Sequence, residues 1–177
     1  MKFEQILKFL IRLNVFLAPI YVLSGASFYF LQRFVAISVV HVLKLLGINA
    51  SLKDLLITVP TFGGHFAGFI DFDCTGWKSM IAFLALVFAT PTKEKKKLYG
   101  LIFLPLIFIV NVIRVSFVFF FVSVKGADYF HLIHSIGWSF GMIFLVLFLW
   151  VLWMKWMRVF ERQNSIRKKI KKARAQL

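Results

Sequence analysis

The sequence predicts an all-α integral-membrane bundle of about four transmembrane helices. A small extracytoplasmic insertion, a β-hairpin and an interfacial helix, precedes Cys74. Of the 177 residues, 60% are hydrophobic and 16% are charged, whereas soluble domains average roughly 45–50% and 25%. Several apolar stretches approach the length of about 20 residues that a helix needs to cross a bilayer. Basic residues gather beside these stretches, which is typical of the cytoplasmic segments of membrane proteins.

Four spans are expected in a single integral-membrane domain over residues 1–157, at about residues 13–31, 75–90, 98–124 and 136–157. The first apolar run could instead be a signal peptide, because Ser24-Gly25-Ala26 resembles a cleavage site. We favour a retained anchor, since the apolar run continues past that point to Leu31. Residues 158–177 are expected to form a basic cytoplasmic tail.

Two segments between the first and second spans do not read as spanning helices. Residues 34–46 are apolar but short, and a stretch of roughly 10–14 residues is typical of an interfacial or packed helix. Residues 55–71 combine β-branched residues with the turn signals Pro60 and Gly63-Gly64, which predicts a small hairpin. A six-span alternative would carry residues 34–46 and 55–72 across the membrane as a pair. Cys74 lies on the same outer face in both arrangements.

The distribution of charge sets the orientation. Three basic residues precede the first span, four lie in residues 93–97, and nine follow from Lys155 onward, which makes 16 of the 22. Under the positive-inside rule these three segments are cytoplasmic. The protein is therefore expected to be a multi-pass cell-membrane protein with both termini in the cytoplasm.

Composition also excludes some classes of function. The net charge of +15 lies beside the apolar stretches, so nucleic-acid binding is not expected. A single cysteine excludes an internal disulfide and every dithiol redox mechanism. One cysteine and scattered histidines lack the spacing of metal ligands, so we expect neither a metal nor a cofactor.

The proposed topology brings a thiol, a guanidinium and an imidazole to one depth of the membrane. Cys74 lies at the outer end of the second span. Arg114 lies 16 residues after the cytoplasmic start of the third span, so about 24 Å along the helix axis. His131 and His134 lie in the outer loop and at the start of the fourth span. These three groups are the parts of a cysteine-nucleophile site.

Each of these residues also has a plainer interpretation. Cys74 is either a nucleophile with a pKa lowered by a helix N-terminus and an arginine, or an inert small hydrophobe. Arg114 either stabilises negative charge or forms a structural ion pair with Asp71, Asp73 or Asp128. Asn111 shares a helix face with Arg114 at a spacing of three residues.

The supporting groups leave alternatives open as well. Asp73 either opposes ionisation of its neighbour Cys74 or orients Arg114 or His134. One of the two histidines would exchange protons with the thiol and the leaving amine, and we favour His134 over His131. The remaining histidines, His41 and His65, are interpreted as structural.

Three short blocks carry a resemblance to a known family. They are Asp73-Cys74-Thr75-Gly76-Trp77, Asn111-Val112-Ile113-Arg114 and His134-Ser135-Ile136-Gly137-Trp138. In this order they resemble the motifs of the archaeosortase/exosortase family, over roughly residues 55–148. The Thr-Gly pair after the cysteine is closer to the archaeal branch. The chain departs from larger members in lacking their extra spans.

The resemblance implies a membrane cysteine protease or transpeptidase. Members act on exported surface proteins that end in a sorting signal, made of a short motif, a hydrophobic span and a basic end. They cleave before the span, and in archaea they transfer the new C-terminus to a membrane lipid. Cys74 would be the nucleophile, Arg114 the electrostatic stabiliser and His134 the acid–base, at the extracytoplasmic face. The alternative is a non-catalytic polytopic protein, such as a transporter subunit or assembly factor, with a structural Arg114.

Overall fold

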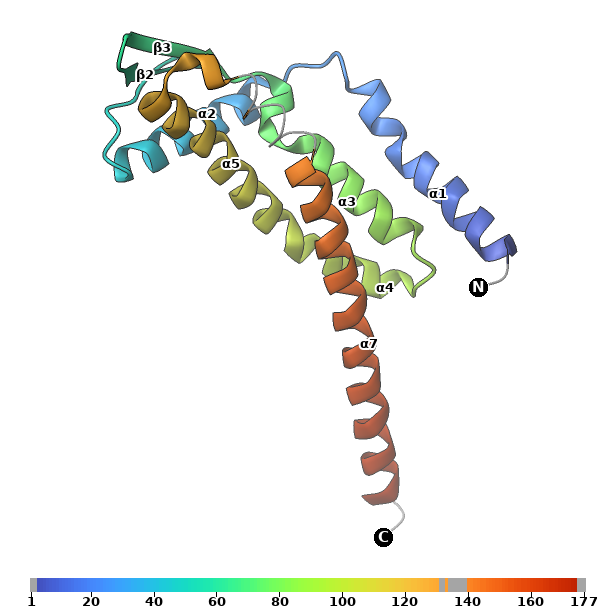
Figure 1. Ribbon diagram of the computed structural model, residues 1–177. Coiled ribbons are helices and arrows are strands. Elements are labelled where there is room, and N and C mark those ends of the chain that lie inside the picture. Colours follow the sequence, from blue (N-terminus) through green and yellow to red (C-terminus); the bar gives the residue numbers. More distant parts are fainter. Residues whose placement is uncertain (1–2, 131–132, 134–139, 175–177) are drawn as a thin grey trace.

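The computed structural model describes residues 3–130, 133 and 140–174 of the chain. Figure 1 shows a helical assembly with a small sheet at one end and the last helix extending away at the other. The main helices are α1 (Phe3–Val22), α2 (Tyr29–Leu45), α3 (Trp77–Ala89), α5 (Leu104–Lys125) and α7 (Met142–Arg174). The short helical elements are η1 (Phe72–Thr75), α4 (Glu94–Lys97), η2 (Leu98–Phe103) and η3 (Ala127–Tyr129).

The first helix differs from the prediction. A continuous helix over residues 13–31 is wrong, because α1 ends at Val22 and Tyr29 already begins α2. Between them Ser24 donates a hydrogen bond of 2.9 Å to the carbonyl of Tyr21 and so closes the last turn of α1. The break falls at Ser24-Gly25-Ala26-Ser27, where serine and glycine disfavour a helix interior.

Helix α2 packs against the rest of the protein along one face. Its buried residues are Gln32, Val35, Ala36, Val39, Val40 and Leu43. Their spacing of three and four residues forms the apolar stripe of a helix that covers a core. This stripe joins Val112, Val115 and Phe119 of α5 and Ile57 and Val59 of the sheet in one hydrophobic cluster. The expectation of a packed helix near residues 34–46 agrees with this arrangement.

The predicted hairpin is present and belongs to a three-stranded antiparallel sheet, in the order β1 (Ser51–Lys53), β2 (Leu56–Thr61) and β3 (Gly64–Phe69). Strands β2 and β3 pair from Leu56 with Phe69 to Thr61 with Gly64. Strand β1 was not predicted, because three residues carry no readable alternation. The turn before β2 uses Asp54 at φ 58°, a conformation that aspartate tolerates better than most residues. Residues 56–69 thus form strands where the six-span alternative expects part of a membrane crossing.

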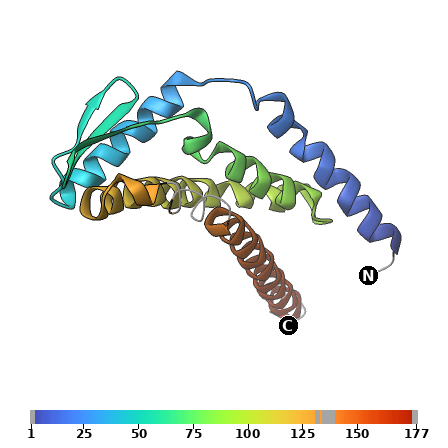
Figure 2. The ribbon, with the colours of Figure 1, turned by 45° about the horizontal axis from the view of Figure 1, so that its top comes forward.

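Two described helical stretches are long and apolar enough to cross a membrane, Phe3–Val22 and the continuous stretch Glu94–Lys125. Helix α3 is apolar and has 13 residues. Its buried residues Phe83 and Val87 form a second hydrophobic cluster with Ile107 of α5 and with one face of α7. Figure 2 shows the sheet beside α2 at the end of α5 that lies far from the N-terminus of α1. The length and apolar character of these two stretches are those of membrane-spanning helices.

The junction between η1 and α3 requires a glycine. Gly76 has φ 77° and ends η1, and a Cβ added there would lie 2.8 Å from Cγ of Asn111. The left-handed conformation and the close approach of α5 both exclude a larger residue at this position. Gly47, after α2, has a similar φ of 81°, but an added Cβ would meet nothing within 4 Å.

This pair of glycines allows a test of the packing. We expect Gly76→Ala to lower the thermal unfolding temperature of the detergent-solubilised protein more than Gly47→Ala. Both variants carry the left-handed strain of about 1–2 kcal/mol. Only Gly76→Ala adds overpacking, which typically costs about 1–3 kcal/mol. Equal unfolding temperatures for the two variants would contradict the close contact between Gly76 and Asn111.

Candidate active site

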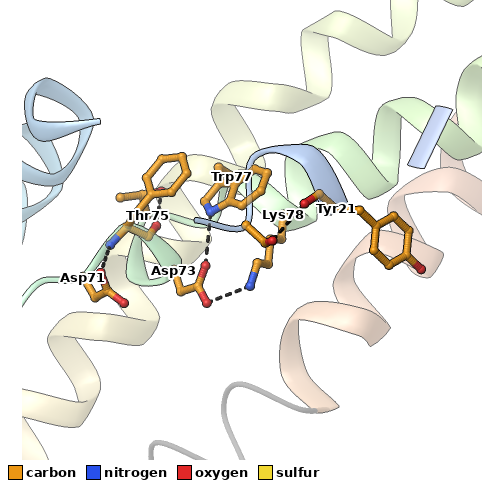
Figure 3. Close-up of polar contacts among 8 residues, drawn as sticks. Tyr21, Asp71, Asp73, Thr75, Trp77 and Lys78 are labelled. Atoms are coloured by element: carbon orange, nitrogen blue, oxygen red, sulfur yellow. Dashed lines mark hydrogen bonds and ion pairs between the residues drawn. The ribbon is translucent and has the colours of Figure 1, made fainter. Parts of the chain in front are cut away.

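Cys74 lies in the short 3₁₀ helix η1, which is stabilised by hydrogen bonds of the side chains at its two ends. The Asp71 carboxylate accepts a hydrogen bond of 2.7 Å from the backbone N–H of Phe72 and so caps the first turn. The fully buried Thr75 donates its hydroxyl to the carbonyl of Phe72 at 2.7 Å. Figure 3 shows both contacts. Capping side chains of this kind fix a turn that is too short to be stable through backbone hydrogen bonds alone.

Helix α5 is joined to this turn through Asn111. The Nδ2 atom of Asn111 donates a hydrogen bond of 2.8 Å to the carbonyl oxygen of Cys74. Asn111 is fully buried, so the loss of this bond would leave buried polar groups unsatisfied. Asn111, which the sequence suggested only through its spacing from Arg114, therefore contacts the backbone of the candidate nucleophile.

Cys74 and Arg114 line the same cavity, which has a volume of about 40 Å³. The Arg114 charge also acts on the Cys74 thiol, so the two groups are neighbours. The other walls are Gly68, Phe69, Ile70, Val115, Val118, Phe119 and Phe130. A space of this size holds about one water molecule. The strand β3 closes it tightly, because a Cβ added to Gly68 would lie 2.7 Å from the Phe119 ring.

Burial raises the pKa of the Cys74 thiol above its ordinary value. A hydrogen bond with the Asp71 backbone and the positive charge of Arg114 act in the opposite direction, but burial outweighs them. The expectation of a lowered pKa is therefore wrong. The physical reason is that the thiol is buried under β3 and α5, and the negative charges of Asp71 and Asp73 add to the effect of burial. The resting side chain is a neutral thiol at neutral pH.

The Asp73 carboxylate forms hydrogen bonds with two side chains that follow it in the sequence. Its carboxylate accepts hydrogen bonds from Lys78 Nζ at 2.7 Å and from Trp77 Nε1 at 3.4 Å (Figure 3). The sequence offered no chemical role for Lys78, because it lies five residues after Asp73 and Gly76 interrupts the helix between them, so no helical spacing indicated the pair. This ion pair is half-buried at the N-terminal end of α3 and connects Asp73 of η1 to that helix.

A larger apolar cavity, of about 570 Å³, lies between α1, α3 and α7. Asp73, Gly76, Lys78 and Asn111 line one part of it, and apolar side chains such as Leu17, Ala82 and Val146 line the rest. The Oδ1 atom of Asn111 is buried and accepts no hydrogen bond from the described residues. Asn111 therefore lines this larger cavity and also binds the backbone of Cys74, whose side chain lines the smaller one.

The two histidines predicted as acid–base candidates, His131 and His134, lie outside the described residues. His41 and His65 lie away from Cys74: the His41 ring contacts the carbonyl of Ile37 within its own helix, and His65 pairs with Pro60 in the hairpin. The structure thus brings Cys74, Asn111 and Arg114 together. The Asp73 carboxylate pairs with Lys78, and its charge helps to raise the pKa of the Cys74 thiol.

The effect of Arg114 on Cys74 can be measured through the pH dependence of thiol alkylation. We expect the midpoint for the detergent-solubilised protein to lie above that of a free cysteine. The variant Arg114→Gln should move it higher still, because the positive charge that lowers the pKa is removed. Arg114→Lys, which keeps the charge, serves as the control. If the pH midpoint of alkylation lies at or below that of the denatured chain, the burial of the thiol is contradicted. If Arg114→Gln leaves the midpoint unchanged, the proximity of Arg114 to Cys74 is contradicted.

Comparison with known proteins identifies a family that matches this chain. A model of the transmembrane exosortases matches residues 4–154, which is most of the chain and includes Cys74, Asn111 and Arg114. No curated protein and no solved structure gave a match. Exosortases are membrane-integral cysteine transpeptidases that act on proteins with a C-terminal sorting signal. The chain belongs to the transmembrane exosortase family.

Proposed function

We propose that this protein cleaves the C-terminal sorting signal of exported surface proteins through a Cys74 thioester. It then transfers the new C-terminus to an acceptor, the amine of a membrane lipid. The observation that carries the proposal is the shared cavity of the Cys74 thiol and the Arg114 guanidinium. A buried, neutral nucleophile beside a fixed cation suits a reaction in which negative charge develops only during attack.

In the first step, the Cys74 thiol attacks the scissile carbonyl and gives its proton to an imidazole. Because the pKa of the thiol is raised, this base is needed at the moment of attack. Arg114 stabilises the oxyanion of the tetrahedral intermediate. The carbon–nitrogen bond then breaks, the signal helix leaves with the imidazole proton on its amine, and the thioester remains.

In the second step, the acceptor amine attacks the thioester and loses a proton to the imidazole. The carbon–sulfur bond breaks and the Cys74 sulfur recovers its proton. We assign the imidazole to His134, with His131 as the alternative. Phe130, which precedes His131 in the chain, lines the Cys74 cavity. This supports a base supplied by the segment after η3.

Substrate entry is proposed from the side of the bundle. The small cavity has room for one water molecule and not for a peptide, so it must widen when substrate binds. The apolar cavity between α1, α3 and α7 reaches Gly76 and Asn111, beside Cys74. Its walls suit the hydrophobic helix of a sorting signal, which would then present its scissile peptide at η1.

The topology belongs to the same proposal. Residues 1–157 form the membrane domain, both termini are cytoplasmic, and Cys74 works at the extracytoplasmic face. The basic residues near the N-terminus, in residues 93–97 and after Lys155 support this orientation. Thr75-Gly76 after the cysteine supports the archaeal branch and hence attachment of surface proteins to lipid.

The proposal predicts that Cys74→Ala abolishes processing of a co-expressed protein with a sorting signal. The variant lacks the only cysteine of the chain, so no thioester can form. The measurement is the mobility of the tagged substrate on an immunoblot, with the membrane level of the enzyme measured in parallel. Ser38→Ala, a small change on α2 that lies outside both cavities, is the control and should retain processing. Normal processing by Cys74→Ala would leave the non-catalytic alternative.

Mass spectrometry of the processed substrate identifies the acceptor. We expect a C-terminus joined through an amide to a lipid headgroup, because the amine competes with water for the thioester. A free carboxyl terminus without a lipid adduct would show a protease and would refute the transfer step. Trapping the acyl group on Cys74 in the intact protein would distinguish both outcomes from cleavage by another enzyme.

A further inference from the structure

A cavity of about 620 Å³ lies at the end of the bundle opposite Cys74. Helix α3 starts beside η1 and ends at Ala89, which lines this cavity. Its 13 residues place the two ends about 18 Å apart. The remaining walls come from the first half of α1, the link after α3, and α7. In Figure 1 these three segments surround the lower part of α3.

Four basic side chains from three helices line this cavity: Lys8 and Arg12 from α1, Lys96 from α4 and Arg158 from α7. Lys8 and Arg12 are four residues apart and so share one face of α1. No carboxylate lines the cavity among the described residues. Lys8 is paired with Glu4 on the helix surface, which reduces its contribution. The cavity nevertheless keeps a positive excess and suits an anion.

Two buried polar groups in the cavity wall have no hydrogen-bond partner in the described part of the chain, Nε1 of Trp153 and the hydroxyl of Thr92. Trp153 is fully buried, and an unsatisfied buried donor is costly. The neighbouring Trp150 differs from Trp153, because its Nε1 atom donates a hydrogen bond of 3.0 Å to the Thr90 hydroxyl. A ligand with acceptor oxygens would satisfy both groups.

The rest of the wall is apolar, which distinguishes a lipid from a free anion. The rings of Phe9 and Trp150 stack at 6.2 Å between α1 and α7, and Met154 and Met157 lie beside them. Helix α1 has no buried residue along its whole length, so its apolar surface continues from the cavity. A small soluble anion would leave these walls unused, whereas acyl chains would cover them.

We propose that this cavity binds the phosphate headgroup of an anionic lipid in the cytoplasmic leaflet and so holds α1 against α7. Arg12, Lys96 and Arg158 contact the phosphate, Trp153 and Thr92 donate to its oxygens, and the acyl chains lie along α1. Basic pockets between helices on the cytoplasmic side are typical sites for such headgroups. This lipid is not the acceptor, because the cavity lies at the other end of the bundle from Cys74. The proposal does not depend on the chemistry of Cys74.

Native mass spectrometry of the detergent-solubilised full chain tests this site. We expect phosphatidylglycerol to bind more tightly than phosphatidylcholine with the same acyl chains. The double variant Arg12→Gln with Arg158→Gln should weaken phosphatidylglycerol binding by roughly fivefold for each charge removed. The control is Lys95→Gln with Lys155→Gln, which removes two exposed cations near the same end but outside the cavity. The control should bind nearly as well as the original chain.

Two other outcomes of this experiment would overturn the site or the assignment of a lipid to it. Equal losses in the two double variants would show a general charge effect and overturn the site. Displacement of phosphatidylglycerol by an equal concentration of inorganic phosphate would show a soluble-anion site and overturn the lipid assignment. Should the double variant fail to fold, Trp153→Phe keeps an aromatic side chain, although a smaller one, and removes the N–H donor. It is expected to weaken binding severalfold, and undiminished binding would refute the proposal.

Discussion

The hydrogen bond from Asn111 to the Cys74 carbonyl is the contact on which the site depends. It joins the turn before α3 to the middle of α5, and it forms because Gly76 leaves space for the amide. Asn111 is fully buried, so neighbouring side chains and not solvent fix its position. Arg114 lies one helical turn later on the same face of α5. The way in which η1 packs against α5 therefore determines where the Arg114 guanidinium lies relative to the Cys74 thiol.

The same packing that forms the site also makes it unreactive at rest. Burial under β3 and α5 keeps Cys74 as a neutral thiol, although Arg114 is near. A thiol of this kind reacts when a base removes its proton during attack. The small cavity holds about one water molecule, which limits access before substrate binds. In the proposed reaction, substrate binding both widens the cavity and completes the set of catalytic groups.

Helix α1 contributes to two cavities at opposite ends of the bundle. Leu13, Leu17 and Ile20 line the apolar cavity near η1, while Lys8 and Arg12 line the basic one. Helix α1 packs against α3, for example through the rings of Phe16 and Phe88, but it has no buried residue. The proposed ligands would therefore add to the contacts that hold it. Binding of a ligand at either end stabilises the bound position of α1 by mass action. The position of α1 is thereby coupled to both proposed ligands.

The sequence by itself determined the membrane character, the packed helix near residues 34–46, the hairpin, and the pairing of Cys74 with Arg114. Apolar length, turn residues and charge placement are local properties, which can be read without knowledge of the fold. The break after Val22, the strand β1 and the partners of Asp73 were not predicted. The tertiary structure alone decided the role of Asn111 and the raised pKa of Cys74. Both depend on burial by segments distant in the chain, and no local pattern encodes how deeply those segments cover a side chain.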